Sequence, residues 1–333
     1  MDYISVPDSG GFVLIDLPDA PQAAGVVRWA RKILKDGAAG LARSMTYSFA
    51  ALELQVSGAS AGISADAKVR DESVAAFANN LPGALGDRSV LLDAAKGVAE
   101  ADLAPLRASD TRDPRYFDPD VAGMLADEGV LASAAWAHGP LAGARVTIDG
   151  AGEPELRLAR AAIAVGATVV ALGNHHLADG FDEAALSTLA GSTDDATDAP
   201  PGEVVDDGLH VEAEVALVGA KSNSVDHRRM EQIVAAVVVP YGRLAVTTRA
   251  LAVAARADRR VLPDFVTVAG PLVAAWPAES SDTDSLRDEA RSRVVSVLDG
   301  LPGGDDGLVL EACVAAEAYL STRRDELPFG RPI

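Results

Sequence analysis

The residues with the clearest chemical potential lie between Val146 and Leu156, in the run Val-Thr-Ile-Asp-Gly-Ala-Gly-Glu-Pro-Glu-Leu. It is a Gly-x-Gly turn that follows an apolar strand and opens an amphipathic helix, and a second apolar run, Ala167–Leu172, comes after that helix. This order is typical of dinucleotide-binding units, in which the helix N-terminus holds a pyrophosphate. The pattern predicts a parallel βαβ unit, with Gly150 and Gly152 as candidate cofactor-binding residues.

The side chains around this turn do not suit a pyrophosphate. In the motif Gly-x-Gly-x-x-Gly the third glycine allows close packing of helix and strand, and Glu155 stands at that position. Asp149 and Glu153 add two more carboxylates. Because acids in the first turn of a helix are favoured by its macrodipole, they would fill the anion site and repel a phosphate. We therefore expect a cofactor fold whose phosphate site is closed.

The charge balance indicates the class of protein and its surroundings. The chain has 333 residues and a net charge of −20, and only five of its 29 basic residues are lysines. That length suits two domains with real cores. Many acids with few lysines and few aromatics are typical of proteins from a cytosol of high salt. The alternative interpretation is an ordinary acidic protein. A chain this acidic is a poor ligand for nucleic acid or anionic lipid.

Cysteine content and hydrophobicity indicate in which cellular compartment the protein is expected. A single cysteine, Cys313, excludes an internal disulfide and a cysteine-based metal cluster. The first ten residues lack a basic stretch followed by an apolar core, so no signal peptide is expected. No apolar run reaches the roughly 18 residues of a membrane-spanning helix. The sequence predicts a soluble, cytoplasmic protein.

Hydrophobic periodicity outlines the elements that must position these residues. The predicted strands are 11–17, 146–148, 167–172, 215–218, 235–239 and 265–268. The predicted helices are 26–35, 38–55, 71–80, 119–137, 226–233, 247–257 and most of the chain from 285. Ser57–Ile63 reads as a flexible turn leading into a short strand, and 110–119, 173–180 and 190–208 read as loops. Alternating strands and helices in the second half predict a parallel sheet.

Several phrases, in order, resemble the Glu/Leu/Phe/Val dehydrogenase family, and its leucine dehydrogenase branch most closely. The phrases are Asp8-Ser-Gly10, Leu41-Ala-Arg-Ser-Met-Thr-Tyr-Ser48, Ser57-Gly-Ala-Ser-Ala-Gly-Ile63, Ala108-Ser-Asp110, the unit Val146–Leu172, and Leu262-Pro-Asp-Phe-Val-Thr-Val-Ala-Gly270. Each phrase is short and weakly specific. Six of them, collinear from about residue 5 to 280, make a fairly specific signal for the fold.

The resemblance implies an α/β protein with two domains. Residues 1–138 would form a mixed-sheet substrate and oligomerisation domain, and residues 139–283 a Rossmann-type, doubly wound domain. The C-terminal helical segment, 284–333, would pack back across the cleft onto the first domain. The family assembles into hexamers or octamers, so an oligomer is expected. Its reaction is the reversible oxidative deamination of an L-amino acid with NAD or NADP.

The same resemblance assigns site residues, and most of them are replaced. Ser48 stands where the family has a lysine that grips the substrate carboxylate, and Ser60 where a second lysine assists attack at the α-carbon. Val268 replaces an asparagine, and Asn174 lies near the position of the acid that holds the adenine ribose. The family's proton-carrying acid is retained as Asp110.

These replacements argue against catalysis. A serine hydroxyl cannot supply the positive charge that stabilises a carboxylate or a developing oxyanion, an effect of about 3–4 kcal/mol even for one neutral donor. Without the lysines, Asp110 would face the cleft lacking its counter-charges. The sequence therefore predicts a catalytically inactive relative that serves as a structural or regulatory subunit, as a homo-oligomer or in a hetero-oligomer with an active paralogue.

Other functions remain open at this point. The chain could be an active dehydrogenase of altered specificity, with cations supplied by Arg28, Arg107 or Arg112, or a small-molecule sensor. A serine nucleophile at Ser48 or Ser60 would need a nearby base, and no histidine lies near either in sequence.

Two further groups of residues are candidate sites. His175 and His176, with Asp179 and Asp182, suggest a metal site only weakly, because adjacent histidines point in different directions. We therefore expect no metal. The basic spot His227-Arg228-Arg229 favours a salt-bridge site on a helix surface over an anion site.

Overall fold

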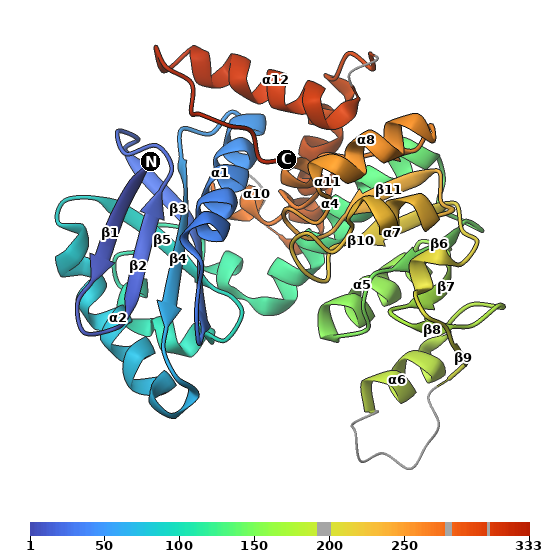
Figure 1. Cartoon of the computed structure of the whole chain (residues 1–333), viewed down its shortest axis with the longest axis horizontal. Helices are drawn as coiled ribbons and strands as arrows, with labels where there is room; N and C mark the ends of the chain where they lie inside the picture. The colour runs from blue at the N-terminus through green and yellow to red at the C-terminus, as the bar shows by residue number, and fades with distance from the viewer. Residues whose placement is uncertain (192–200, 277–281, 305–306) are drawn as a thin grey trace. The chain divides into compact units, whose positions relative to one another are not determined.

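The computed structural model describes residues 1–191, 201–276, 282–304 and 307–333, which form two compact units. Unit 1 is Met1–Asp113 with Cys313–Pro332, and unit 2 is Pro114–Ala312 with Ile333. Each unit contains one sheet with helices packed on it (Figure 1). The division falls after Asp113, because α4 (Pro119–His138) packs against α5 (Glu153–Ala164) and α11 (Thr283–Asp299) of unit 2.

Unit 1 contains a five-stranded mixed sheet in the order β1-β2-β4-β3-β5. Its strands are β1 (Asp2–Val6), β2 (Gly11–Ile15), β3 (Gln22–Ala30), β4 (Ser57–Ser64) and β5 (Ser89–Ala94). Its helices are α1 (Lys35–Ala51), α2 (Arg70–Leu85) and α3 (Ala104–Arg107), together with most of α12 (Leu308–Ser321). The strands β3, β4 and β5 are parallel, and β1 and β2 are antiparallel to their neighbours. This is the mixed α/β sheet that the sequence predicts.

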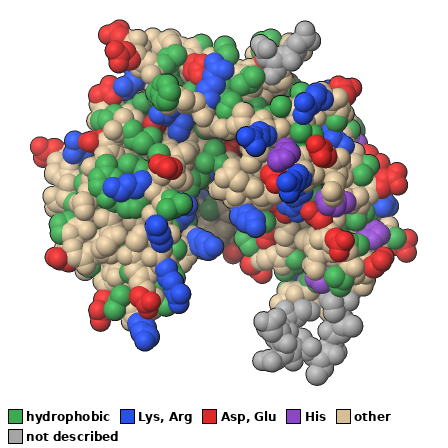
Figure 2. Space-filling view, in the orientation of Figure 1, with side chains coloured by type: hydrophobic (Ala, Val, Ile, Leu, Met, Phe, Trp, Pro, Cys, Tyr) green, Lys and Arg blue, Asp and Glu red, His purple; other side chains and the backbone are tan. Residues whose placement is uncertain are grey.

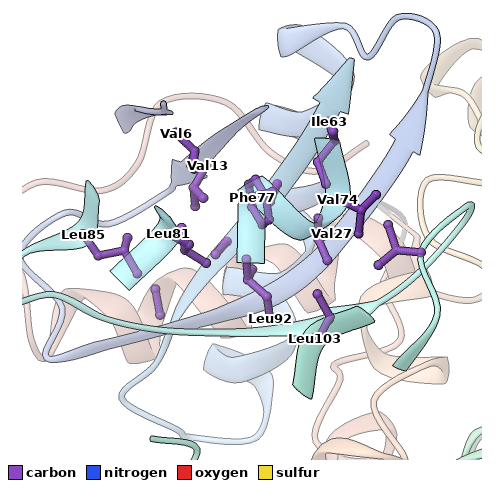
Figure 3. Packing of buried hydrophobic residues seen from close by; sticks show 14 of the residues in the cluster. Val6, Val13, Val27, Ile63, Val74, Phe77, Leu81, Leu85, Leu92 and Leu103 are labelled. Carbon is purple, nitrogen blue, oxygen red and sulfur yellow. The ribbon is translucent and has the colours of Figure 1, made fainter. Parts of the chain in front are cut away.

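One face of this sheet packs against α2 and forms the main core of unit 1. Figure 3 shows Val13, Val27 and Ile63 of three strands around Phe77 of α2. These side chains come from alternate positions of each strand, as the pleat requires. Burying each of them contributes about 1.5–3 kcal/mol. The intervening residues, including Ser60 and Arg28, therefore lie on the opposite face.

The prediction of a helix over 26–35 is wrong, because residues 22–30 form the interior strand β3. Gly25 lies so close to β4 that an added Cβ would be 1.7 Å from the carbonyl oxygen of Ala59. Ala23 and Val27 fill the core facing α2. The alanine and basic residues suit a helix locally, but pairing of β3 with β4 on one side and β5 on the other overrides that propensity.

Ser57–Ile63 is not a flexible turn, because all of it lies in β4, between β2 and β3. Its glycines serve packing: a Cβ on Gly58 would lie 1.8 Å from the carbonyl oxygen of Ala42 in α1. Thr46 of α1 accepts a hydrogen bond from the Gly58 N–H at 2.9 Å. Small residues let α1 lie directly on β4. The composition of this segment alone suggests a flexible turn instead.

Unit 2 contains a seven-stranded sheet in the order β12-β11-β10-β6-β7-β8-β9. Its strands are β6 (Arg145–Ile148), β7 (Thr168–Leu172), β8 (His175–His176), β9 (Glu203–Val204), β10 (Val215–Val218), β11 (Val237–Pro240) and β12 (Arg260–Val261). The strands β12, β11, β10, β6 and β7 are parallel, and β8 and β9 extend the edge in antiparallel fashion. The predicted βαβ unit is β6-α5-β7.

Besides α4, α5 and α11, unit 2 contains several shorter helices. They are α6 (Glu183–Gly191), α7 (His227–Gln232), α8 (Thr248–Arg256), α9 (Asp264–Thr267) and α10 (Leu272–Ala275). The predicted strand 265–268 is wrong, since Pro263 caps α9 and Arg260–Val261 supply the edge strand. A short run such as Phe265–Val268, whose first three residues are buried, fits a strand or a buried helical turn equally well.

The predicted loop 173–180 contains β8, and the predicted acidic loop 190–208 lies partly outside the described residues, at 192–200. In the rest of that loop, Glu203–Val204 form β9. No helix in the described part of the chain is both long and apolar enough to cross a membrane.

Candidate functional site

In unit 2 the glycine turn, residues Asp149–Glu155, connects β6 to α5. Gly150 adopts a φ of +115°, which side chains rarely tolerate, so the turn requires glycine there. Gly152 is the N-cap of α5 and makes no side-chain cap. The backbone is therefore that of a turn that could accept an anion at the helix N-terminus.

The Glu155 side chain folds back over this turn. Its Oε2 lies 2.8 Å from the point where a Cβ of Gly152 would be, and its Cδ lies 3.3 Å from that of Gly150. Its Oε1 accepts a hydrogen bond from the Tyr241 hydroxyl at 2.9 Å, and the residue is only 8% exposed. A carboxylate of this chain thus occupies the space above both glycines.

Tyr241 holds that carboxylate in place from the end of β11. Its hydroxyl contacts both Glu155 and the backbone carbonyl of Asp149. Burial, together with the charges of Glu155 and Asp149, raises the pKa of Tyr241 well above its usual value, so the phenol stays a hydrogen-bond donor. The sequence reasoning missed Tyr241, which lies 86 residues from Glu155 in the chain.

The sequence predicts that all three acids of the turn crowd the phosphate position. For Glu153 and Asp149 this prediction is wrong. Glu153 is exposed in the first turn of α5. Asp149 is buried and accepts from Ser224 Oγ at 2.8 Å and from the Gly219 N–H at 3.3 Å. It also pairs with Arg229 at 2.8 Å. Only Glu155 closes over the glycines.

Arg229 lies between two acids. Besides Asp149 it contacts Asp207 at 2.5 Å. Burial alone would lower the pKa of Arg229, but the hydrogen bonds that it donates to Asp207 and the charge of Asp149 raise it instead. The predicted salt-bridge role is correct, but its place is not the helix surface, because the side chain is only 22% exposed.

Asn174, the candidate at the ribose position, is exposed just after β7. Its backbone carbonyl accepts from Val205, and the Gly173 carbonyl accepts from Gly208. These two hydrogen bonds hold residues 205–208 beside Asn174. Asp207 belongs to that segment, so an acid lies near the ribose position that the sequence did not indicate. Its carboxylate is already bound to Arg229.

In unit 1 the retained acid Asp110 lies in an ionic cluster. Its carboxylate contacts Arg112 at 2.7 Å and Arg107 at 3.2 Å, and Arg112 also reaches Asp93 of β5 at 2.8 Å. The side chains of Asp110 and Arg112 are 2% and 1% exposed. The expectation that Asp110 lacks counter-charges is therefore wrong, because Arg107 at the end of α3 and Arg112 both pair with it.

The cluster sets the protonation of Asp110. Burial by itself would raise the pKa of this carboxyl, but hydrogen bonds from Arg112 and the charges of Arg112 and Arg107 hold it below its usual value. A carboxylate of low pKa is a weak base, so it accepts a proton poorly at neutral pH.

The two candidate serines are both buried, Ser48 in α1 and Ser60 in β4. They lie on neighbouring elements, since α1 packs on β4. Within the described chain the Ser60 hydroxyl has no hydrogen-bond partner. Unit 1, which holds both serines, contains no histidine, since all five histidines of the chain lie in unit 2.

Those histidines form no candidate metal centre. Figure 2 shows several of them, in purple, on the right-hand part of one face. His175 and His176 are neighbours on β8, where successive side chains point to opposite faces. Among the described residues no group of three potential ligands is arranged for a metal ion.

Comparison with known proteins gives structural matches only. No protein-family model and no curated protein matches the sequence. The fold matches a hetero-hexameric glutamate dehydrogenase from Thermus thermophilus in its Leu-bound form, with 24% identity, a TM-score of 0.76, and coverage of 96% of this chain and 86% of that one.

Two further solved structures agree with that match. Glutamate dehydrogenase from Plasmodium falciparum matches with 12% identity and a TM-score of 0.72, covering 97% of this chain and 83% of that one. The enzyme from Peptoniphilus asaccharolyticus matches with 15% identity and a TM-score of 0.67, covering 98% and 92%. The chain therefore has a glutamate dehydrogenase-like fold over nearly its full length, as the resemblance implies.

Proposed function

We propose that this chain is a non-catalytic subunit with an amino acid dehydrogenase fold, which acts in a structural or regulatory role beside an active relative. The observation that carries the proposal is the Glu155 carboxylate above Gly150 and Gly152. A pyrophosphate bound there would have to displace Glu155 or share a buried space with its negative charge, and like charges at contact distance in a low dielectric repel strongly. The residues present do not fit NAD or NADP.

The polar groups of unit 1 support the same proposal. Serines stand at both lysine positions of the family, and a neutral hydroxyl supplies no charge to a substrate carboxylate. Asp110 is bound to Arg112 and Arg107, which lowers its pKa and its capacity to carry protons. The retained acid therefore serves the loop's stability rather than proton transfer.

Assembly with a second kind of subunit has a precedent in the fold. The matched Thermus thermophilus protein is a hetero-hexameric glutamate dehydrogenase. We extend that arrangement to this chain, and an assembly of this kind would let a non-catalytic chain alter an active one through shared contacts. The second part of the proposal is therefore that the chain forms a hetero-oligomer with an active relative, and a homo-oligomer is the alternative.

Nucleotide titration tests the first part. In roughly molar KCl, calorimetry of NADH and NADPH should detect no binding to the wild-type chain at millimolar nucleotide. Glu155→Gly, which opens the turn, should bind NADH measurably. Glu153→Gly is the matched control, because it removes an equal charge from an exposed position in the same helical turn.

Micromolar binding of either nucleotide by the wild-type chain would contradict the closed turn. Equal behaviour of Glu155→Gly and Glu153→Gly would show that Glu155 is not what excludes the nucleotide.

The competing function is an active dehydrogenase of altered specificity, in which an arginine replaces the missing lysines. A screen of common L-amino acids with NAD and NADP decides between the two, since steady turnover would refute the proposal. If the chain is active, the double change Ser48→Lys and Ser60→Lys should lower its rate, and if it is inactive that change should add at most a trace.

Co-assembly is tested by native mass spectrometry of the chain purified alone and after co-expression with an amino acid dehydrogenase from the same organism. Mixed oligomers containing both subunits are expected. Separate homo-oligomers under all salt conditions would remove the hetero-oligomeric part of the proposal.

A further inference from the structure

Three of the five lysines of this acidic chain lie at one edge of the sheet in unit 1. Lys32 follows β3, Lys68 follows β4 and Lys96 follows β5, and Arg31 is next to Lys32. Because β3 lies between β4 and β5 and all three strands are parallel, their carboxyl ends meet at the same edge, within about 10 Å of one another. Together these four residues make up what we call the basic edge.

Backbone hydrogen bonds join the segments that carry the basic edge. The N–H of Trp29 donates to the carbonyl of Lys96 at 2.9 Å, and the N–H of Ala65 donates to the carbonyl of Ala30 at 3.2 Å. Figure 2 shows a row of Lys and Arg side chains, in blue, on the part of unit 1 where β4 ends in Figure 1. The cations of the basic edge therefore belong to one surface.

The basic edge has no ion pair within the described part of the chain. All four of its side chains are exposed. Two nearby acids are engaged elsewhere, since Asp71 pairs with Arg70 and Asp66 accepts a hydrogen bond from the backbone N–H of Lys68. The four residues carry a charge of +4, so the rest of the chain carries −24.

Two exposed apolar residues lie in the same segments. Leu34 is 62% exposed and Val69 is 42% exposed. They are the N-cap residues of α1 and α2, and neither gives its helix a side-chain cap. Helices favour Ser, Thr, Asp or Asn at that position, and α4 and α11 do begin at capping aspartates. Both residues therefore reduce the stability of the isolated chain, which indicates that a contact covers them.

The charges decide what that contact is. Apolar residues bordered by polar ones are the usual composition of a protein interface, and a basic border needs an acidic partner. A second copy of this chain offers such a surface, because it carries −24 outside its own basic edge. Nucleic acid is acidic too, but it would be repelled by the rest of the chain.

We propose that the basic edge, with Leu34 and Val69, is a contact surface for an acidic face of a second copy of this chain. The lysines and Arg31 pair with carboxylates, and the two apolar side chains pack against the partner. The contact joins different surfaces of the two copies, so it can repeat around a ring. It goes beyond the proposed function, because copies can meet in this way whether or not unit 2 accepts a nucleotide.

Carbodiimide cross-linking of the full-length chain tests the contact, because the reagent joins a lysine amine directly to a carboxylate that touches it. Chains labelled with light and heavy nitrogen are mixed in roughly molar KCl, so that links between copies are recognised by mass. We expect links from Lys32, Lys68 and Lys96 to Asp or Glu of the other copy. Lys221, an exposed lysine of unit 2, is the internal control and should give at least tenfold fewer links.

Charge reversal measures how much the basic edge contributes. Lys32→Glu with Lys68→Glu should weaken self-association at least tenfold in sedimentation equilibrium at constant KCl. Lys221→Glu with Arg228→Glu is the matched control, because it changes the net charge equally at two exposed residues of unit 2. That control should associate like the wild type.

Leu34→Ser separates the contact from the fold. A serine can cap α1, so the melting temperature should rise at a protein concentration where the chain is a monomer. Self-association should weaken severalfold, because an exposed apolar contact is lost. A leucine that serves only the fold would give the opposite result, a lower melting temperature with unchanged association.

Four outcomes would overturn the inference. They are a chain that stays monomeric, links from Lys221 as frequent as those from the basic edge, unchanged association of Lys32→Glu with Lys68→Glu, and links from the basic edge only to a co-expressed dehydrogenase. None of them depends on the binding of NADH, so this inference and the closed nucleotide turn fail separately.

Discussion

At the scale of single residues, identical chemical groups have opposite consequences in this protein because of what surrounds them. Glu153 and Glu155 are two positions apart in the first turn of α5, yet one is exposed and the other lies over the glycines beneath Tyr241. Helical geometry explains the difference, since residues two apart face in different directions. Counting acids near a turn therefore overstates how many of them can close it.

Asp110 provides a test of the ionic cluster in unit 1. Asp110→Asn should lower the free energy of unfolding by about 3 kcal/mol at pH 7, because it leaves the buried Arg112 and the partly buried Arg107 undercompensated. Chemical denaturation at constant KCl measures this. Asp71→Asn, at a 90% exposed acid paired with Arg70, is the control and should change stability by less than about 0.5 kcal/mol.

The effect of Asp110 depends on pH in a defined direction. The pKa of Asp110 is lower in the folded chain than in the unfolded one, where it is about 3.9. Its stabilising contribution is therefore complete above that value and is lost as the pH falls through the lower folded pKa. The difference between wild type and Asp110→Asn should shrink below about pH 4. A difference that stays constant from pH 7 to 3 would contradict the ionic origin.

At the scale of elements, small residues determine how closely helix and sheet pack in unit 1. Gly58 and Gly62 alternate with Ser60 along β4, and Gly58 lies against the backbone of α1. Thr46 anchors the same contact through its hydroxyl. The pattern Gly-x-Ser-x-Gly is therefore the contact surface for a helix, and it places Ser60 on the buried face beside α1.

Gly58→Ala tests that close approach. Its Cβ would lie 1.8 Å from the Ala42 carbonyl oxygen, so α1 must move away, and we expect a loss of about 3 kcal/mol or an unfolded chain. Gly83→Ala in α2 is the control, because its Cβ would meet nothing within 4 Å. That exposed helical change should be neutral or stabilise by up to about 1 kcal/mol. Equal stabilities in thermal denaturation would show that α1 tolerates a looser contact.

At the scale of the whole molecule, the net charge of −20 opposes compact folding in dilute buffer. We propose that the protein is adapted to high salt. Raising KCl from 0.1 to 2 M at pH 7 should raise the melting temperature by about 5 °C or more, since the Debye length falls below the spacing of surface charges. The control is the same series near the isoelectric point of about 4.5, where the salt effect should be much smaller. A melting temperature independent of KCl at pH 7 would contradict halophilic adaptation.

Local order in the sequence was enough for the β6-α5-β7 unit and the parallel sheet of unit 2, and the mixed sheet of unit 1 followed from the family resemblance. Apolar runs of strand length around a long amphipathic segment admit few arrangements, and the predicted helices 119–137 and 247–257 match α4 and α8 closely. The two glycines and Glu155 at the third position were also readable, because a turn and the helix after it depend on neighbours within a few residues.

Contacts between distant segments were decided only by the tertiary structure. Residues 26–30 favour a helix by composition and become a strand because β4 and β5 pair with them. The ion pair of Arg112 with Asp93 of β5 and the hydrogen bond of Tyr241 to Glu155 both join residues whose meeting depends on how the strands are arranged in the sheet. Local propensity carries no information about those pairings, because their free energy arises only after the chain has folded.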